Sequence, residues 1–480
     1  MTSPRPRSLC WLSKGSTKIE VLSPSRLLHR YAWLLAAVVA PASVSEEAVE
    51  EIQLAIEPRW GGHYRSGAWL PLTLTLENRG DAITGQVVIE SGDARLSLPV
   101  DLPSPSRKSF ELYLPPSRGA RRSLEARLST AEGEEVRSEA SLTPLIRPLV
   151  VVVGDELRSS PIPRDLDAEV IRVNAGALPE LWKGYESVTG VVIDPEDMSS
   201  LRDAQRRALE QWALVGGNLW IRGDPLLSMS GRRFVIRDNG AEVPQPETSR
   251  FALVPLLTLL FVVICVLQFV FPRNLTGAVR RYVFTLVAAI AVSFLAVRLP
   301  TWLVGGSALV RHASILHVFP NETDSYITTR TVLRPVSRRE GKVRSVSRDS
   351  FFAAKRLELD EHGRLMASWS MSLGSQVPFD SERFAESPFS LEGSEGRYVI
   401  TNRSASVLQQ CGGDGDETRD LGEIQPHKSL ELIAAGLESV TCTVRGALPP
   451  LAPLEVEPDA VESESHAVVV FHLGGASGAI

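Results

Sequence analysis

The sequence predicts a multidomain α+β membrane protein, built from an exported β-sandwich, an α/β domain, a two-helix transmembrane hairpin and a C-terminal β-sandwich-like domain. Three observations predict this arrangement. Short runs of alternating apolar and polar residues occupy two separate regions, a strand–helix–strand pattern follows the first, and two long apolar runs precede the second. A chain of 480 residues is also long enough for about three ordinary domains. The expected boundaries are 1–45, 46–146, 147–248, 249–304 and 305–480.

The composition is that of a folding chain and excludes one class of partner. Hydrophobic residues make up 44% of the chain and charged residues 22%, which separates it from disordered chains. The net charge is −6 and no long basic block occurs, so we expect no nucleic-acid partner. Four cysteines without a CxxC pair are too few for a disulfide scaffold.

Residues 1–45 are typical of an export segment. Basic residues dominate residues 1–30, in which Glu20 is the single acid. The apolar stretch YAWLLAAVVAPAS follows, and Ala40 and Ala42 have the size and spacing of a signal cleavage site. Because the basic region is long for a signal peptide, the segment is either a cleaved signal peptide or an N-terminal anchor. In both cases we expect the following domain to be exported.

Residues 46–146 are expected to form an antiparallel β-sandwich. Stretches such as AWLPLTLTLENRG and KSFELYLPP alternate apolar and polar residues over short runs, and turn residues separate them. The aromatic residues Trp60, Tyr64 and Trp69 fit two interpretations. They could form a platform for sugar rings, or they could pack in the core and rim of the sandwich, which is the more common use of aromatic side chains.

Residues 147–248 change to an α/β pattern. The continuous apolar run LVVVV ends at Gly154 and suits a strand that is covered on both faces. A short strand at 188–193, a helix over 200–215 and a strand at 218–222 follow with short links. This order indicates a parallel sheet with helices.

The start of the expected helix carries polar groups that allow two interpretations. Ser199 or Ser200 is expected to cap the helix, and Gly216 to end it. Three acids precede it: Asp194, Glu196 and Asp197. They could bind a divalent cation or another ligand at the carboxyl end of the sheet. The favoured interpretation is that they satisfy free backbone amides and complement the helix dipole.

Residues 249–304 are expected to form the transmembrane hairpin. The run 251–271 holds no charge and is long enough to cross a bilayer, and the run 282–304 carries only Arg298, close to its end. The link between the runs holds only basic charges: Arg273, Arg280 and Arg281. By the positive-inside rule this link is cytoplasmic. We therefore expect a protein of the inner (cytoplasmic) membrane with both large domains on the outer side, and a pair of buried core helices is the alternative.

Residues 305–480 return to β patterns, and two features stand out. Cys411 and Cys442 end two strand-like runs, VLQQC and VTCTV, so in an exported domain they can pair as a disulfide or stay as two buried thiols. An acidic stretch between them includes Asp414 and Asp420 and resembles a calcium loop. Because the glycine and glutamate positions of the EF-hand pattern do not match, a solvated hairpin tip is the favoured interpretation.

The stretch 184–224 resembles the class I glutamine amidotransferase-like fold, in which a strand, a turn, a helix ending in Gly-Gly and another strand also follow in that order. Catalytic members of that family use a cysteine nucleophile with a histidine base. Residues 147–240 contain neither cysteine nor histidine, and no G-x-S-x-G elbow replaces them. The resemblance therefore implies the fold without the activity.

The whole order also resembles a group of bacterial membrane-anchored envelope proteins with a catalytically incomplete domain of this kind, encoded beside MoxR-type AAA+ ATPases and von Willebrand A proteins. The resemblance is carried by LPELWKGYESVTGVVI, LRDAQRRALEQWALVGGNLWI, the Arg-flanked hairpin and YVITNRSASVLQQC with LGEIQPHKSLEL. It implies a role in an envelope assembly and identifies no catalytic residue.

These observations lead to a function prediction with two alternatives. We expect a non-enzymatic, membrane-anchored scaffold or partner-binding component whose partners are the bilayer and other envelope proteins. We expect no cofactor and no metal, because no P-loop, HExxH or dinucleotide-binding pattern occurs. A divergent amidotransferase-like hydrolase that uses Asp194 or another acid is one alternative, and a carbohydrate-binding envelope protein is the other.

Overall fold

The computed structural model describes three stretches of the chain. They are residues 51–154 except 118 and 120, residues 167–221, and residues 308–473 except 336–339, 372–374, 395, 416–418, 434–436, 446–453 and 458–459. The export segment expected at 1–45 and the hairpin expected at 249–304 lie outside the described residues.

The first described stretch forms an antiparallel β-sandwich. One sheet has the strand order β1-β3-β6, and the other contains β5, β4, β7 and β8 in that order. The strands are β1 (Ile52–Pro58), β3 (Leu70–Asn78), β4 (Ile83–Ser91), β5 (Ala94–Leu102), β6 (Ser106–Leu114), β7 (Ser123–Thr130) and β8 (Glu135–Ser141). Alternate residues of β1 and β7 are buried, and the four leucines of β3 are fully buried. The period of two in the sequence therefore places one face of each strand in the core.

The second sheet of this sandwich continues into the C-terminal region. Residues 356–358 of β18 (Arg356–Leu359) pair in parallel with residues 95–97 of β5. Beyond β18 the sheet runs through β19 (Leu365–Ser370), β16 (Glu340–Ser345) and β27 (Leu454–Glu457), which gives eight strands. Phe351, Leu357 and Trp369 are buried in the same apolar core as the first sandwich. The described residues between 51 and 473 accordingly belong to one compact unit.

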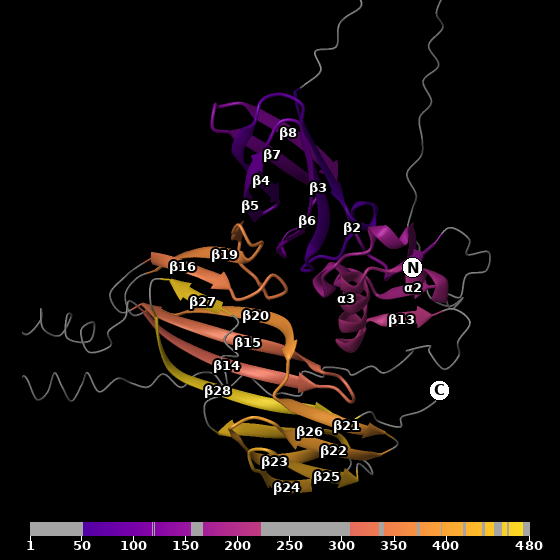
Figure 1. Cartoon of the computed structure of the whole chain (residues 1–480), viewed down its shortest axis with the longest axis vertical. Helices are drawn as coiled ribbons and strands as arrows, with labels where there is room; N and C mark the ends of the chain where they lie inside the picture. The colour runs from indigo at the N-terminus through magenta and orange to yellow at the C-terminus, as the bar shows by residue number, and fades with distance from the viewer. Residues whose placement is uncertain are drawn as a thin grey trace, which may run out of the picture. The chain divides into compact units, whose positions relative to one another are not determined.

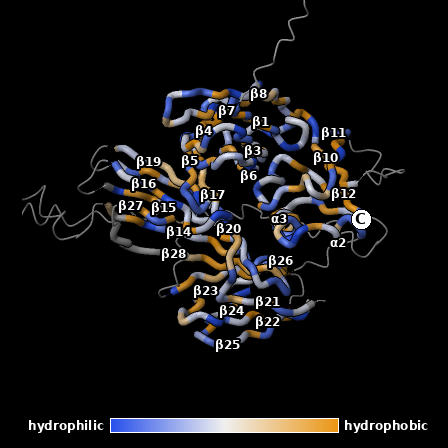
Figure 2. Tube along the Cα trace, turned by 45° about the horizontal axis from the view of Figure 1, so that its top comes forward, coloured by the Kyte–Doolittle hydropathy of each residue, from blue (hydrophilic) through white to orange (hydrophobic). Residues whose placement is uncertain are grey.

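A small parallel sheet follows the first sandwich. Its strand order is β11-β10-β12-β13, and its strands are β10 (Leu149–Val153), β11 (Glu169–Val173), β12 (Gly190–Ile193) and β13 (Asn218–Ile221). Every residue of β10 and β12 is buried, as expected for strands covered on both faces, and Figure 2 shows the apolar residues along them. One face packs on Leu209 and Trp212 of the helix α3 (Asp203–Leu214). The same core includes Phe319, Tyr326 and Phe384 from the C-terminal region.

The helix expected over 200–215 is shorter than predicted at its start. A separate helix, α2 (Pro195–Ser200), comes first, and Leu201 is extended between α2 and α3. The hydroxyls of Ser199 and Ser200 donate to carbonyl oxygens within α2 and do not cap α3. The end agrees with the prediction, because Gly216 has a φ of 109°, which favours glycine.

The C-terminal region is built from strands. An eight-stranded sheet has the order β17-β20-β15-β14-β28-β26-β23-β24, and a three-stranded sheet has the order β21-β22-β25 (Figure 1). The strands of the first are β14 (Ala308–Val318), β15 (Asp324–Pro335), β17 (Phe351–Phe352), β20 (Val377–Glu386), β23 (Val407–Gly415), β24 (Arg419–Ile424), β26 (Leu437–Arg445) and β28 (Ala460–His472). Those of the second are β21 (Phe389–Ser394), β22 (Arg397–Asn402) and β25 (Lys428–Ile433). A shared apolar core that includes Leu391, Ile400 and Phe471 joins the two sheets.

The prediction of a multidomain α+β membrane protein is wrong. In the part of the chain that the structure describes, strands dominate, and the only α-helices are α2 with 6 residues and α3 with 12. None of the described helices has the length and apolar character needed to cross a bilayer, which contradicts the prediction of an inner-membrane protein. An amidotransferase-like α/β domain is also not supported, because the parallel sheet shares its core with distant C-terminal strands. The strand–helix–strand pattern predicts which elements follow one another along the chain. It does not predict which distant strands complete their core.

Candidate functional site

A buried segment joins three parts of the described chain. The 3₁₀ helix η5 (Trp182–Tyr185) lies between the first sandwich, the helix α3 and the strand β20, and all four of its residues are buried. Such an irregular segment must satisfy its backbone polar groups without a ladder of its own. Side chains of the first sandwich supply partners. Trp60 Nε1 donates to the Gly184 carbonyl at 3.1 Å, and the Leu181 N–H donates to the Tyr113 hydroxyl at 3.1 Å.

Lys183 is the centre of this junction. Its side chain is only 3% exposed, and its Nζ lies 2.9 Å from a carboxylate oxygen of Glu186 and 2.9 Å from one of Glu382. Burial by itself lowers the pKa of Lys183, but the charges and hydrogen bonds of Glu382 and Glu186 outweigh it and raise the pKa above its ordinary value. Lys183 is therefore a charged, doubly paired lysine that ties η5 to β20.

The two carboxylates have further partners in the junction. Glu186 accepts a hydrogen bond from the Trp69 backbone N–H at 2.8 Å, and Glu382 accepts one from the Tyr326 hydroxyl at 2.5 Å. Burial, followed by the charge of Glu382, raises the pKa of Tyr326 well above its usual value, so the phenol stays a donor. Each of these partly buried carboxylates thus has two polar partners.

An aromatic cluster surrounds the ion pair. The ring centroid of Trp182 lies 5.6 Å from that of Tyr326, 5.5 Å from Phe384 and 6.2 Å from Phe351, in edge-to-face arrangements. The Lys183 ammonium lies 4.6 Å from the centroid of the Trp182 ring, within cation–π distance. The aromatic and ionic contacts together hold the junction in one arrangement.

A cleft of about 360 Å³ lies beside the junction. Its apolar lining comes from β5, β6, Leu181, Phe351 and the β18–β19 hairpin. Its polar lining consists of these side chains: Ser109, Glu111, Tyr113, Arg348, Asp360, Glu361 and His362. Ligand sites are commonly clefts of this size, mostly apolar and placed where parts of a protein meet. The cleft is therefore the candidate binding site.

The inner acids of the cleft already have structural partners. Glu111 accepts a hydrogen bond from the Glu180 N–H at 2.9 Å and one from the Tyr113 hydroxyl. Asp360 accepts bonds from the backbone N–H groups of His362 and Arg364, each at 2.9 Å. Partial burial acts to raise the pKa of Asp360, but the hydrogen bonds from Arg364 and His362 outweigh it and lower the pKa. Groups held in this way suit a rigid binding wall better than proton transfer.

The three acids predicted as binding candidates lie outside this cleft. Asp194 is the N-cap residue of α2, and its carbonyl accepts the Met198 N–H at 2.8 Å. Glu196 and Asp197 lie in the first turn of α2, where carboxylates complement the helix dipole. Across the described stretches, no group of three His, Cys, Asp or Glu side chains could hold a metal ion.

The aromatic residues of the first sandwich pack inside the protein. Trp60 is 2% exposed, Tyr64 2% and Trp69 3%, and the Trp69 ring meets Phe351 edge-to-face at 5.1 Å. Of the two interpretations of these residues, core packing matches their burial, because a sugar platform requires exposed ring faces. Asp414 and Asp420 flank the β23–β24 turn, and residues 416–418 of that stretch lie outside the described part.

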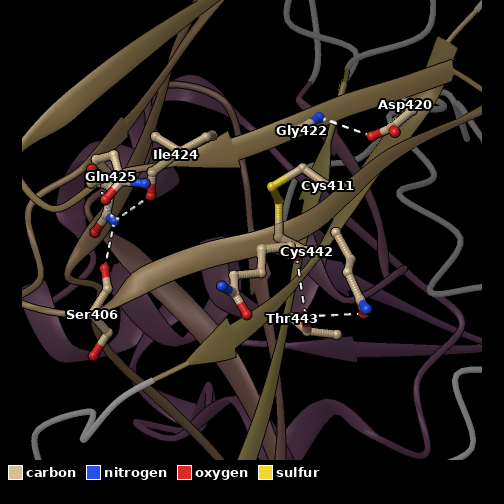
Figure 3. The surroundings of a disulfide bond; sticks show 11 residues. Ser406, Cys411, Asp420, Gly422, Ile424, Gln425, Cys442 and Thr443 are labelled. Carbon is tan, nitrogen blue, oxygen red and sulfur yellow. Dashed lines mark hydrogen bonds between the residues drawn. A yellow bond between two sulfur atoms is a disulfide. The ribbon is translucent and has the colours of Figure 1, made fainter.

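Cys411 and Cys442 are joined by a disulfide. They lie on the neighbouring antiparallel strands β23 and β26, with a Cα–Cα distance of 4.1 Å, and both side chains are fully buried (Figure 3). The register of β23 shifts next to Cys411, and Gln410 has a positive φ of 51°, so a β-bulge turns Cys411 toward the partner strand. The bond lies in the apolar core between the two C-terminal sheets.

The central residues of the junction were not singled out from the sequence. Lys183 and Glu186 belong to the stretch LPELWKGYESVTGVVI, but Glu382 lies in a distant strand that no local pattern connects to them. A lysine between Trp182 and Gly184, in a stretch with few charges, is a signal of burial with a partner. The sequence does not indicate which carboxylate that partner is.

Comparison with known proteins assigns a family to one part of the chain only. No curated protein matches the sequence. Residues 51–143, which form the first sandwich from β1 to the end of β8, match the domain of unknown function DUF8726.

Proposed function

We propose that this protein is a non-enzymatic binding component, a scaffold that holds a partner in the cleft beside Lys183. The observation that carries the proposal is the cleft itself. It lies where the first sandwich, the η5 segment and the C-terminal strands meet, and its inner acids Glu111 and Asp360 are committed to structural hydrogen bonds. A rigid, partly apolar cleft of this kind can stabilise a bound group, and its two inner acids are held in place by these hydrogen bonds.

An envelope assembly is the proposed setting. The resemblance of the sequence to bacterial envelope proteins supports it. The disulfide between Cys411 and Cys442 also supports it, because disulfides form and persist in oxidising compartments.

Site-specific photo-crosslinking in the native host tests the proposal. A photoreactive amino acid replaces Glu361, whose exposed side chain lies on the rim of the cleft, and in a control chain it replaces Arg137 on the far strand β8. We expect one discrete adduct with another polypeptide from position 361 and none from position 137. No adduct at position 361, or the same adducts at both positions, would contradict the proposal. Recovery of a chemically altered small molecule from the cleft would favour an enzyme.

A further inference from the structure

The strand β8 forms one end of the eight-stranded sheet that starts at β27. Figure 1 shows it at the end of the row β5, β4, β7 and β8. Within the described residues its backbone ladder is with β7 alone. An unpaired edge presents N–H and C=O groups on which another strand can form a ladder. The free edge of β8 is therefore a candidate interaction surface.

The hydrogen bonds to β7 decide which backbone groups of β8 point to the free edge. At one end of the ladder the Leu142 N–H donates to the Arg122 carbonyl at 2.9 Å. At the other end the Thr130 N–H donates to the Glu134 carbonyl at 3.0 Å. Because hydrogen-bonded positions alternate in an antiparallel pair, the even-numbered residues of β8 bond to β7. The backbone groups of the odd-numbered residues point to the free edge, and these residues include Glu135, Arg137 and Glu139.

The exposed face of β8 holds one charge without a partner. Arg137 is 57% exposed and already pairs with Glu135 at 3.0 Å and with Glu125 of β7 at 4.0 Å. Glu139 is exposed and has no ion pair with any described residue. In the ladder it lies opposite Glu125, and like charges directly opposite each other are destabilising. A cation on the free side of Glu139 would oppose this repulsion.

A second copy of β8 places Arg137 opposite Glu139 in a single register. Two identical antiparallel strands are related by a two-fold axis, and both residues of each hydrogen-bonded pair must be odd-numbered here. With the axis at Ser138, Arg137 of each copy lies opposite Glu139 of the other. The half-buried Val136 and Ala140, which pack against the core, then also lie opposite each other. Moving the axis by one residue brings Arg137 opposite Arg137 or Glu139 opposite Glu139, which is unfavourable.

We propose that two copies of this chain associate through the edges of β8, paired antiparallel about a two-fold axis at Ser138. The two eight-stranded sheets then form one continuous sheet. The edge is short, because the Ser141 carbonyl oxygen would lie only 2.7 Å from a Cβ atom on Gly62 and is already covered. The dimer is therefore weak, with a dissociation constant on the order of 10–100 μM. The inference is independent of the proposed binding function, because β8 does not line the cleft.

Charge reversals test the register in the full chain. We expect Arg137→Glu and Glu139→Arg each to weaken self-association at least about tenfold, because each places like charges opposite each other across the axis. The double variant restores opposite charges at both positions and should associate within about threefold of the parent chain. An equimolar mixture of the two single variants should form a heterodimer for the same reason. Sedimentation equilibrium measures all four cases.

Glu135→Arg is the matched control for these reversals. It makes the same change of charge on the same face of β8, but residue 135 lies opposite the uncharged Ser141 in the proposed register. We expect it to leave self-association within about threefold of the parent chain. The melting temperatures of all variants, measured in dilute solution, should stay equal to that of the parent.

A cysteine at the axis gives a direct readout of the register. Ser138 faces its own copy in a non-hydrogen-bonded pair, where Cα atoms lie about 4.5 Å apart, a distance that a disulfide can bridge. In a chain with Cys10 and Cys265 replaced by serine, we expect Ser138→Cys to form a disulfide-linked dimer on mild oxidation. Ala140→Cys lies on the same face but away from the axis, and it should stay monomeric.

Three results would overturn the inference. They are a parent chain that stays monomeric up to roughly 200 μM, single reversals that associate as strongly as the parent, and equal disulfide formation by the two cysteine variants. The chain that carries a photoreactive group at position 137 lacks Arg137, so we expect no adduct with a second copy from it. The adduct expected from position 361 therefore tests the proposed function alone.

Discussion

Lys183 shows how a single buried charge connects segments that are distant in sequence. Its partner Glu382 lies 199 positions away, and the side chain of Lys183 is 3% exposed. Such a pair adds little net stability compared with a well-packed apolar group. Its loss has a cost, however, because the two partly buried carboxylates, which are 34% and 37% exposed, then remain without their cation.

Replacing Lys183 tests the importance of this pair. We expect Lys183→Met to lower the free energy of unfolding by about 1–3 kcal/mol, because it leaves the partly exposed Glu186 and Glu382 without their cation. Chemical denaturation with urea measures the change. Arg330→Met, which breaks the more exposed ion pair with Asp380, serves as the control and should cost no more than about 1 kcal/mol. Equal losses in the two variants would show that Lys183 has no special role.

Gly184 provides a second test at the level of a single residue. A Cβ atom on Gly184 would lie 2.5 Å from a side-chain carbon of Pro179 and 3.0 Å from the Tyr113 ring. We expect Gly184→Ala to destabilise the protein by about 1–3 kcal/mol through this overpacking. Gly176→Ala is the matched control, since no heavy atom lies within 4 Å of its Cβ position. Melting temperatures compare the two variants, and an unchanged value for Gly184→Ala would contradict the close packing of η5.

Two further features of the fold each connect a pair of strands. The first is a pair of buried histidines. His317 on β14 and His472 on β28 lie in parallel neighbouring strands, with His317 Nδ1 3.0 Å from His472 Nε2 and their rings stacked at 5.2 Å. Burial, then the neighbouring His472, lowers the pKa of His317 to about 3, and burial lowers the pKa of His472 to about 4. Both imidazoles are therefore neutral in the folded protein near pH 7.

This pair predicts a loss of stability in acid. Unfolded histidines bind protons below their ordinary pKa of about 6.5, whereas the folded pair does not until about pH 4 to 3, so protons favour unfolding across that window. We expect the free energy of unfolding to fall by up to about 1.4 kcal/mol per pH unit for each histidine within the window. Urea titrations between pH 7 and pH 4.5 measure the slope. His472→Phe should flatten it, and a change at the exposed His362 should not; identical slopes for both would contradict the prediction.

The disulfide joins a second pair of strands, β23 and β26. The two cysteines are 31 positions apart in sequence, so the bond closes a loop of moderate length in the unfolded chain. We expect replacement of both Cys411 and Cys442 by alanine to cost about 3–4 kcal/mol in the chain-entropy model. Urea denaturation measures this loss. Mass spectrometry of the unreduced digest should find the two cysteine peptides joined, and separate peptides with free thiols would contradict the bond.

At the scale of the whole molecule, the sandwich that matches the domain family is only part of a larger compact unit. The match to DUF8726 covers residues 51–143, but the core of that sandwich includes Phe351, Leu357 and Trp369 from the C-terminal region. The strand β18 also covers part of the edge of β5. An isolated sandwich would expose both that edge and the apolar surface beneath these side chains.

Expression of residues 51–146 alone tests this dependence. We expect the fragment to associate or aggregate and to melt at a lower temperature than the same residues in the full chain. Size-exclusion chromatography gives the association state, and hydrogen exchange followed by mass spectrometry compares the protection of β5 in the fragment and the full chain. A monomeric fragment in which β5 is as well protected as in the full chain would contradict the prediction.

Local patterns were enough to place many individual elements. Each of these predictions depends on residues within a few positions of one another. The patterns are the alternation in the first sandwich, the continuous apolar run of β10 and the glycine at the end of α3. The cysteine pairing was open from the sequence, because both partners end strand-like runs whose neighbours are unknown without the fold. The start of α3 was missed because Leu201 adopts an extended conformation, which the helical spacing does not reveal.

The arrangement of the sheets depended on contacts between segments that are far apart in the chain. Three of these contacts have no local signature in the sequence. They are the pairing of β18 with β5, the shared core of β10 with Tyr326 and Phe384, and the ion pair of Lys183 with Glu382. The hydropathy of an apolar strand predicts that the strand is buried. It does not distinguish among the many other strands that could cover it. Shape complementarity and the pairing of buried charges select among them, and these properties exist only once the chain has folded. The cleft beside the junction is bounded by such distant segments, and its position is therefore a property of the tertiary structure.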